Sequence, residues 1–296
     1  MRSLSQDNGA TINLNAGQVI GAGQNGQPFV ASQGRTANVS VFQPRGTIPY
    51  NALQATLNRR FARGLQLGAS WTWSKSEAPN YPTDALNYQW LASRPVQGSD
   101  RTHVLTINGV WELPFGKGKP WVSTNKIGSA ILGGWTINSL AVFYGGLPFS
   151  VTSSTTSLNM PGASQRADQV KANVDFYGNV GGAYFDPLAF VPITAARFGN
   201  AGSNSLRGPG EVNMDVGLNR VFRIKEKYDL QFRAESFNFT NTPHFANPGG
   251  NVSNLVLNAD GSVRNLGGFA QIQSVANTGR DGIDERQFRF MMRFSF

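Results

Sequence analysis

Residues 286–296, the last eleven of the chain, read RQFRFMMRFSF. Successive residues of a β-strand point to opposite faces of a sheet, so an apolar side chain at every second position predicts a strand with one apolar face. Met291 alone breaks the alternation. The predicted apolar face carries Phe288, Phe290, Met292, Phe294 and Phe296, and the polar face carries Gln287, Arg289, Arg293 and Ser295.

Six further segments have the same two-residue period. It is strict in residues 65–73 (LQLGASWTW), and in residues 211–224 only Arg220 and Val221 depart from it. The alternation is weaker in four segments, residues 50–59, 101–113, 131–151 and 228–240. In the last of these the apolar phase changes between Ala234 and Phe237, which indicates a bulge or a strand end.

The strands and their links have the proportions of a membrane barrel. A tilted strand needs about ten residues to cross the hydrocarbon layer, whereas soluble strands usually have about five or six. Residues 60–64 and 225–227 are tight links, and three long, Gly/Asn/Pro-rich loops span residues 75–100, 152–210 and 241–285. This pattern predicts an all-β fold, an antiparallel up-and-down transmembrane β-barrel fragment with short periplasmic turns and long extracellular loops.

Strand parity then gives a direction and a domain organisation. If the last strand ends in the periplasm, all three long loops lie outside, and the tight turns and the link 114–130 lie inside. We expect residues 50–296 to be the C-terminal part of the barrel. Residues 1–49 are rich in Gly and Asn and predict mostly extracellular loop, with room for one strand. Seven or eight long strands result.

Composition excludes several other classes of protein. The 296 residues include no cysteine, which rules out disulfides, thiolate zinc sites and cysteine nucleophiles. No stretch approaches the 18 apolar residues of a transmembrane helix, and residues 1–10 lack the apolar core of a signal peptide. We therefore expect a fragment of a longer precursor, located in the bacterial outer membrane.

The formal charge of +9 fits either nucleic acid or anionic lipid as a partner. The positions of the basic residues favour lipid headgroups over nucleic acid as the partner. The alternative is that basic residues at turns are simply solvated. The bases at the inferred periplasmic ends are Arg59, Arg60, Arg63, Lys117, Lys119, Lys126, Arg220, Arg223, Lys225 and Lys227.

No motif indicates catalysis, a metal or a cofactor, so we expect no enzyme. Residues 21–26 (GAGQNG) match a dinucleotide-binding pattern, but no helical period follows and no acidic residue lies between Asp7 and Glu77 to hold a ribose. The two histidines, His103 and His244, have no second ligand at metal-binding spacing. The remaining acidic cluster, Asp281, Asp284 and Glu285, is better explained as a solvated loop than as a cation site.

The inferred barrel assigns positions to polar and aromatic side chains. We expect seven polar residues to face the lumen: Gln66, Asn213, Asp215, Arg233, Glu235, Arg289 and Arg293. Aromatic residues fall at both strand ends, as interfacial girdles require. They are Tyr50, Trp71 and Trp73 at the outer end, and Phe222, Tyr228 and Phe296 at the inner end. A soluble β-sandwich is the alternative, because alternation alone does not distinguish lipid from a second sheet.

Several ordered segments resemble one family. They are YNALQATLNRRFARGLQLGASWTWSKS, DRTHVLTINGVWELPFGKGK, GGWTINSLAVFYGGLPFSVT, FGNAGSNSLRGPG, LQFRAESFNFTNTPHF and RQFRFMMRFSF. Together they are similar to the C-terminal half of the barrel in TonB-dependent receptors, particularly the Oar-like group with a carboxypeptidase-regulatory-like domain. The resemblance spans about residues 50–296.

This resemblance implies a 22-stranded barrel with an N-terminal plug, which imports a scarce ligand with energy relayed through TonB. It also implies that Phe288, Phe290, Phe294 and Phe296 form a signal for the outer-membrane assembly machinery. The chain contains no plug and no TonB box, so the missing N-terminal part and its strands would be needed for coupling and for closing the barrel. The alternative function is a structural or adhesive barrel without transport.

Overall fold

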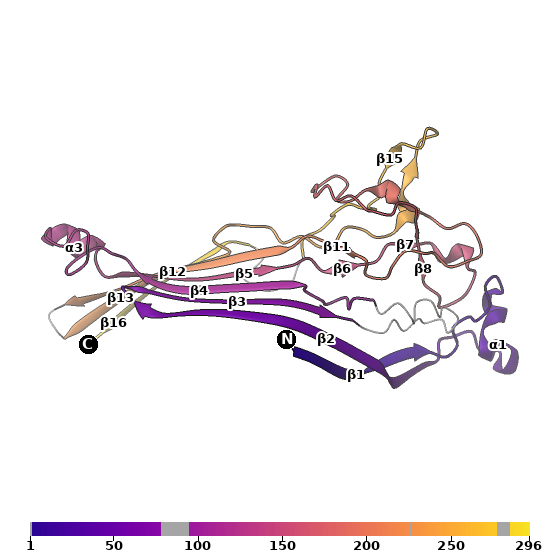
Figure 1. Cartoon of the computed structure of the whole chain (residues 1–296), viewed down its shortest axis with the longest axis horizontal. Coiled ribbons are helices and arrows are strands. Elements are labelled where there is room, and N and C mark those ends of the chain that lie inside the picture. The colour runs from indigo at the N-terminus through magenta and orange to yellow at the C-terminus, as the bar shows by residue number, and fades with distance from the viewer. Residues whose placement is uncertain (1, 78–94, 225–226, 277–284) are drawn as a thin grey trace.

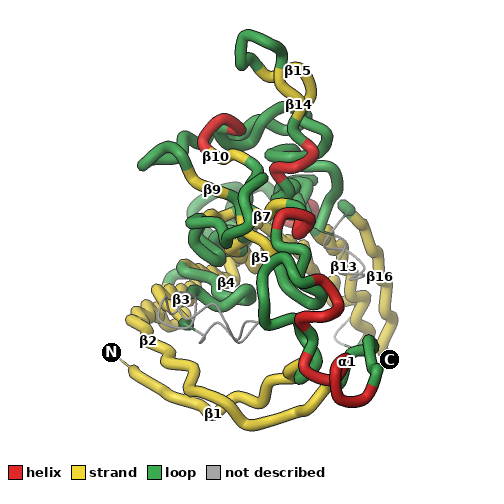
Figure 2. Tube along the Cα trace, turned by 90° about the vertical axis from the view of Figure 1, so that its right-hand side faces the viewer, coloured by secondary structure: helices red, strands yellow, loops and turns green. Residues whose placement is uncertain are grey.

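An eight-stranded antiparallel sheet dominates the fold, and its strands pair in chain order. The computed structural model describes residues 2–77, 95–224, 227–276 and 285–296. The sheet strands are β1 (Arg2–Asn13), β2 (Ser40–Ala62), β3 (Leu65–Ser76), β4 (His103–Glu112), β5 (Trp135–Tyr144), β12 (Glu211–Ile224), β13 (Tyr228–Phe237) and β16 (Gln287–Ser295). The all-β, up-and-down prediction is confirmed. Within these residues β1 and β16 are the edges of the sheet, which is curved but not closed (Figure 2).

The links between the strands divide the molecule into two ends (Figure 1). The strand ends that the links β1–β2, β3–β4, β5–β12 and β13–β16 join lie at the end that we call the loop end. The strand ends that the links β2–β3, β4–β5 and β12–β13 join lie at the opposite end, the turn end, as strand parity predicts. The β2–β3 turn is tight because Arg63 and Gly64 both have positive φ, 54° and 79°, a conformation that narrow hairpins require.

Strands β2, β5 and β13 differ from the predictions at an identifiable boundary. β2 begins at Ser40, so residues 1–49 contain β1 and the start of β2 as well as the link 14–39. β5 covers only Trp135–Tyr144 of the predicted 131–151 segment, because helix α3 (Lys126–Leu132) precedes it and Gly134 adopts a φ of 76°. β13 ends at Phe237 with an unbroken register, so the phase change marks a strand end and not a bulge.

The register shows which side chains share a face, because directly opposed residues of antiparallel strands point to the same side. One row of opposed residues crosses six strands and consists of apolar side chains: Leu65, Trp111, Ile137, Leu218, Ala234 and Phe290. We call this side the apolar face and the other side the polar face. Among the described residues, no helix is long and apolar enough to span a membrane.

Two of the links at the loop end, β5–β12 and β13–β16, pack around an apolar core of their own. We call residues 145–210 and 238–276 the loop module. Phe185 is fully buried at its centre, with ring centroids of Phe149, Phe190 and Phe269 at 5.8, 6.0 and 5.4 Å. The other core residues are Val151, Ala167, Ala189, Ala201, Leu206, Val252 and Ala270. Buried aromatic side chains dominate the energetics of such a small core, so the links form a folded unit above the sheet (Figure 2).

Short elements complete the loop end. Those of the β1–β2 link are η1 (Gly23–Gly26) and α1 (Pro28–Gln33). Those of the loop module are β6 (Pro148–Phe149), β7 (Thr152–Ser153), η2 (Thr155–Ser157), β8 (Gln165–Arg166), β9 (Asp168–Gln169), η3 (Pro187–Ala189), β10 (Phe190–Val191), β11 (Leu206–Arg207), η4 (Val252–Asn254), β14 (Val256–Leu257) and β15 (Val263–Asn265). The β1–β2 link packs on the module through Gly17 N–H, which donates to Pro161 O at 2.7 Å.

Candidate functional site

The polar face of the sheet carries all seven residues that were expected to face a lumen. The register joins Gln66 through Val110 and Asn138 to Gly217, and from there to Glu235 and Arg289. The odd-numbered residues of β12, β13 and β16 lie on this same side because side chains alternate along a strand. This face therefore holds Gln66, Asn213, Asp215, Arg233, Glu235, Arg289 and Arg293. That it borders a lumen stays a prediction.

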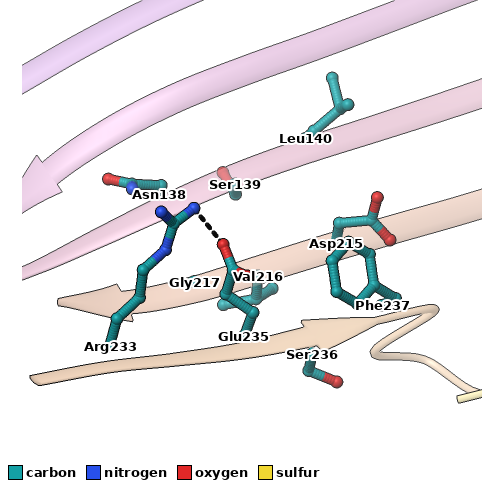
Figure 3. A pocket seen from close by; sticks show the side chains of 10 residues that line it. All are labelled: Asn138, Ser139, Leu140, Asp215, Val216, Gly217, Arg233, Glu235, Ser236 and Phe237. Carbon is teal, nitrogen blue, oxygen red and sulfur yellow. Dashed lines mark hydrogen bonds and ion pairs between the residues drawn. The ribbon is translucent and has the colours of Figure 1, made fainter. Parts of the chain in front are cut away.

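Charges of both signs meet at the middle of the polar face, around a hollow of about 180 Å³ (Figure 3). Arg233 and Glu235 form an ion pair along β13, and Figure 3 shows the guanidinium turned toward the carboxylate. Asp215 accepts hydrogen bonds from Asn213 Nδ2 at 3.1 Å and from Asn238 N at 3.0 Å. Arg289 faces Glu235 across the β13–β16 pair. These groups offer donors and acceptors to a polar ligand.

A second hollow, of about 410 Å³, lies on the polar face near the loop end. Its lining is largely hydroxyl and amide: Tyr50, Gln54, Thr72, Ser74, Ser76, Gln97, Ser99, Asp100, Arg101 and Val104. Tyr50 was expected in an aromatic girdle with Trp71 and Trp73. Tyr50 pairs with Ser76, whereas Trp71 and Trp73 lie at odd-numbered positions of the same strand as Ser76. Because side chains alternate along a strand, Tyr50 lies on the opposite face from both tryptophans. This expectation was wrong for Tyr50.

Two adjacent residues fasten the loop module to the strand ends. Asp100 pairs with Arg207 at 2.6 Å, and Arg101 pairs with Glu211 at 2.5 Å. Asp100 also accepts the Ser76 N–H at 2.8 Å. Arg207 and Arg101 donate further to the carbonyls of residues 146 and 145 at 3.1 and 2.7 Å. We call Asp100, Arg101, Arg207 and Glu211 the outer clamp, because they join β3, β4, β5 and β12 at the loop end.

The interior of the loop module also contains charged groups. Arg166 is buried and donates to Ala201 O at 3.0 Å, and its burial lowers the pKa of the guanidinium to about 10. Nearer the surface, Arg197 donates to both carboxylate oxygens of Asp168 and holds the pKa of that carboxyl below its usual value. The loops are therefore held by polar contacts as well as by apolar burial.

The predicted assembly signal lies along the apolar side of the last strand. Phe288, Phe290 and Phe294 oppose Ser236, Ala234 and Leu230 of β13. Phe296 follows the strand, with its ring 6.3 Å from that of Phe294. Recognition of these residues by the assembly machinery stays a prediction.

The glycine-rich motif and His244, which the sequence did not assign to a cofactor or metal site, make structural contacts. The N–H groups of Gly21 and Gly23 donate to the carbonyls of Leu158 and Asn159 at 2.8 Å each. A short helix, α1, does follow the GAGQNG motif, contrary to expectation, with Pro28 in its first turn. His244 Nε2 lies 2.9 Å from Val212 O. Asp281 and Asp284 lie outside the described residues, within which no cluster of potential metal ligands occurs.

Comparison with known protein families decides the class. The family model described as an outer membrane beta barrel domain matches residues 2–289. The chain belongs to this family. Its location is therefore the bacterial outer membrane, as the strand lengths and links predict. A comparison with curated proteins found no match.

The outer clamp and the charged core of the loop module were not predicted from the sequence. Asp100 and Arg101 open the segment DRTHVLTINGVW, which was predicted as a strand from residue 101, and Arg207 lies in LRGPG, at the end of the predicted loop 152–210. The available signal was a charged residue near a predicted strand end, next to glycine in the case of Arg207 and Glu211. Such a signal gives no partner, because the clamp joins residues more than a hundred positions apart.

Proposed function

We propose that the chain forms part of the wall and outer loops of a TonB-dependent receptor that takes up a scarce ligand. The observation that supports this proposal most directly is the polar face, where Asp215, Arg233, Glu235 and Arg289 lie on neighbouring strands beneath a folded loop module. A lumen lined by donors and acceptors suits passage of a polar solute. The ordered segments similar to TonB-dependent receptors support the mode of energy coupling.

The two faces of the sheet have different partners in this proposal. The apolar face, with Phe290 72% and Met292 68% exposed, contacts outer-membrane lipid. The terminal phenylalanines are read by the assembly machinery before the barrel closes with the remaining strands. TonB contacts only the N-terminal part of the full protein, together with the plug. No nucleic acid is involved, and no catalytic group or cofactor takes part.

A second candidate function is adhesion, and the loop module is the observation that favours it. An apolar core centred on Phe185 and the outer clamp give these loops a fixed shape. A rigid exposed surface pays little entropy on binding, which suits attachment to a surface partner without transport.

Gene deletion combined with loss of TonB distinguishes the two functions. Strains that lack the gene are grown on limiting iron chelates, cobalamin, oligosaccharides or peptides, with and without a functional TonB protein. A receptor gives a growth defect on one nutrient class, and the deletion adds nothing when TonB is already absent. An adhesin gives a loss of surface attachment that does not depend on TonB, and this result would refute uptake.

A further inference from the structure

Helix α3 exposes apolar side chains at the turn end, beside the sheet (Figure 1). Ile127 is 74% exposed and Ile131 is 61% exposed. These residues are four positions apart and therefore share one side of the helix. Trp121, in the segment that leads to the helix, is 57% exposed. An exposed apolar patch of this kind marks an interaction site.

The C-terminus of α3 is fixed to the apolar face of the sheet. Arg220 lies on that face of β12 and is only 9% exposed, and its guanidinium donates to the carbonyls of Ala130 and Ile131. Trp135 Nε1 donates to Ile131 O at 3.0 Å. A cation at this position also interacts favourably with the helix dipole. Arg220 thus breaks the apolar alternation of β12 because it holds the helix end.

Two aromatic rings also lie close to the Arg220 guanidinium. Its central carbon lies 4.1 Å from the ring centroid of Phe222 and 5.4 Å from that of Trp135. Charged side chains at membrane depth are tolerated when they bind backbone carbonyls, and aromatic rings add a cation–π contribution. The contact therefore places α3 on the same side of the sheet as the apolar row, in continuity with it.

Basic residues flank the exposed apolar side chains. Lys117 and Lys126 are exposed, whereas Lys119 pairs with Glu112 at 2.7 Å. Apolar side chains combined with lysines at one level are typical of segments that lie in a membrane interface. Short turns of outer-membrane barrels lie in the periplasm, so this level corresponds to the inner leaflet, whose phospholipid headgroups include anionic ones.

We propose that Trp121 and α3 form an interfacial anchor. Ile127 and Ile131 enter the boundary between headgroups and acyl chains of the inner leaflet, and Lys117 and Lys126 contact anionic phospholipid headgroups. Arg220 is a positioning residue, which fixes the helix end against the barrel wall. Lipid is the occupant that this surface fits, because the apolar side chains continue the apolar face of a membrane sheet and the exposed lysines Lys117 and Lys126 lie beside them.

Spin-label accessibility in vesicles tests the anchor directly. The chain contributes no cysteine, so single Ile127→Cys and Val180→Cys variants of the full-length protein are labelled specifically once any cysteine outside these 296 residues is replaced by serine. Val180 lies in the loop module and is 56% exposed, which makes it the aqueous control. In phosphatidylethanolamine/phosphatidylglycerol vesicles, we expect a ratio of oxygen to nickel-chelate accessibility several-fold higher at Ile127 than at Val180. Equal ratios overturn the proposal, and so does exclusion of both reagents, since that indicates a protein partner.

Two further variants test the parts of the anchor, with heat-modified gel mobility as the check that the barrel has folded. Arg220→Gln releases the helix end, so the Ile127 label becomes more accessible to the nickel chelate, and Arg220→Lys restores part of the difference. Lys117→Gln combined with Lys126→Gln lowers immersion in phosphatidylglycerol vesicles but not in pure phosphatidylcholine. An unchanged label in Arg220→Gln refutes the positioning role, and a lysine effect independent of lipid composition refutes headgroup recognition.

Discussion

Asp100 and Arg207, 107 positions apart in the sequence, form an ion pair of 2.6 Å at the loop end of the sheet. The Asp100 side chain is 1% exposed and that of Arg207 is 33% exposed. Removing Arg207 would be costly because the Asp100 charge would stay buried without compensation. The pair therefore joins the loop module to the strands and differs from a solvent-exposed surface ion pair.

Asp100→Asn is expected to destabilise the folded protein by about 1.5 to 3 kcal/mol, the range for hydrogen bonds to charged groups. The amide keeps an acceptor for Ser76 N–H but loses the charge that faces Arg207. Urea denaturation in detergent micelles, followed by tryptophan fluorescence, measures this change in free energy. Proteolysis of the loop module in intact membranes should accelerate in parallel.

Asp229→Asn is the matched control for this substitution. Its partner Arg223 lies 4.0 Å away, and both side chains are more than half exposed. Exposed pairs contribute about 0 to 1 kcal/mol, so this variant should denature almost like the wild type. Equal losses in the two variants would show that the outer clamp has no special role.

A glycine contact behind the clamp gives a second prediction. A Cβ atom on Gly146 would lie 1.8 Å from Gly208 O, so Gly146→Ala forces backbone apart in the LRGPG segment. Overpacking of this kind typically costs about 1 to 3 kcal/mol. We expect a lower urea midpoint and faster loop proteolysis. Gly98→Ala is the control, since its nearest neighbour would be Asn204 Nδ2 at 3.9 Å; a comparable loss there would contradict the steric explanation.

Much of the sheet could be predicted from the sequence, since β3, β12 and β16 each have two faces of different chemistry. β1 could not, because its residues RSLSQDNGATIN show no sustained apolar period. Its strand conformation is defined by pairing with β2 over most of its length. Main-chain pairing of that kind leaves no pattern in side chains.

Part of the candidate site could be predicted from the sequence, and part could not. The seven polar residues of the polar face follow from alternation alone. The loop module does not, because Phe149, Phe185 and Phe269 come together from distant positions without any period. Likewise, the exception at Arg220 was visible in the sequence, but its reason was not, since the carbonyls that it binds belong to a helix 89 and 90 positions away.

Acid should weaken the loop module at one identifiable carboxylate. Arg197 and the Asn200 N–H hold the pKa of Asp168 below its usual value. The resulting stabilisation is fully present above the unfolded pKa of about 3.9 and is lost as the pH falls through the lower folded value. Hydrogen exchange of residues 165–200 measures it. Near pH 5, about one unit above the unfolded pKa, the Asp168→Asn variant should exchange faster than the wild type. In stronger acid the two proteins should exchange at equal rates. A ratio of variant to wild-type exchange rates that does not change with pH would contradict the assignment.

Adjacent residues of β16 test which face meets lipid. Phe290 lies on the apolar face opposite Ala234, and Met291 lies on the polar face opposite Arg233. Phe290→Arg should cost about 2 to 4 kcal/mol if its face is in hydrocarbon near the midplane. Met291→Arg places like charges opposite each other, which costs at most about 1 kcal/mol. Because the introduced side chain is the same, a gap in urea stability between the two folded variants reports the facing, and equal losses would mean that the apolar face does not contact lipid.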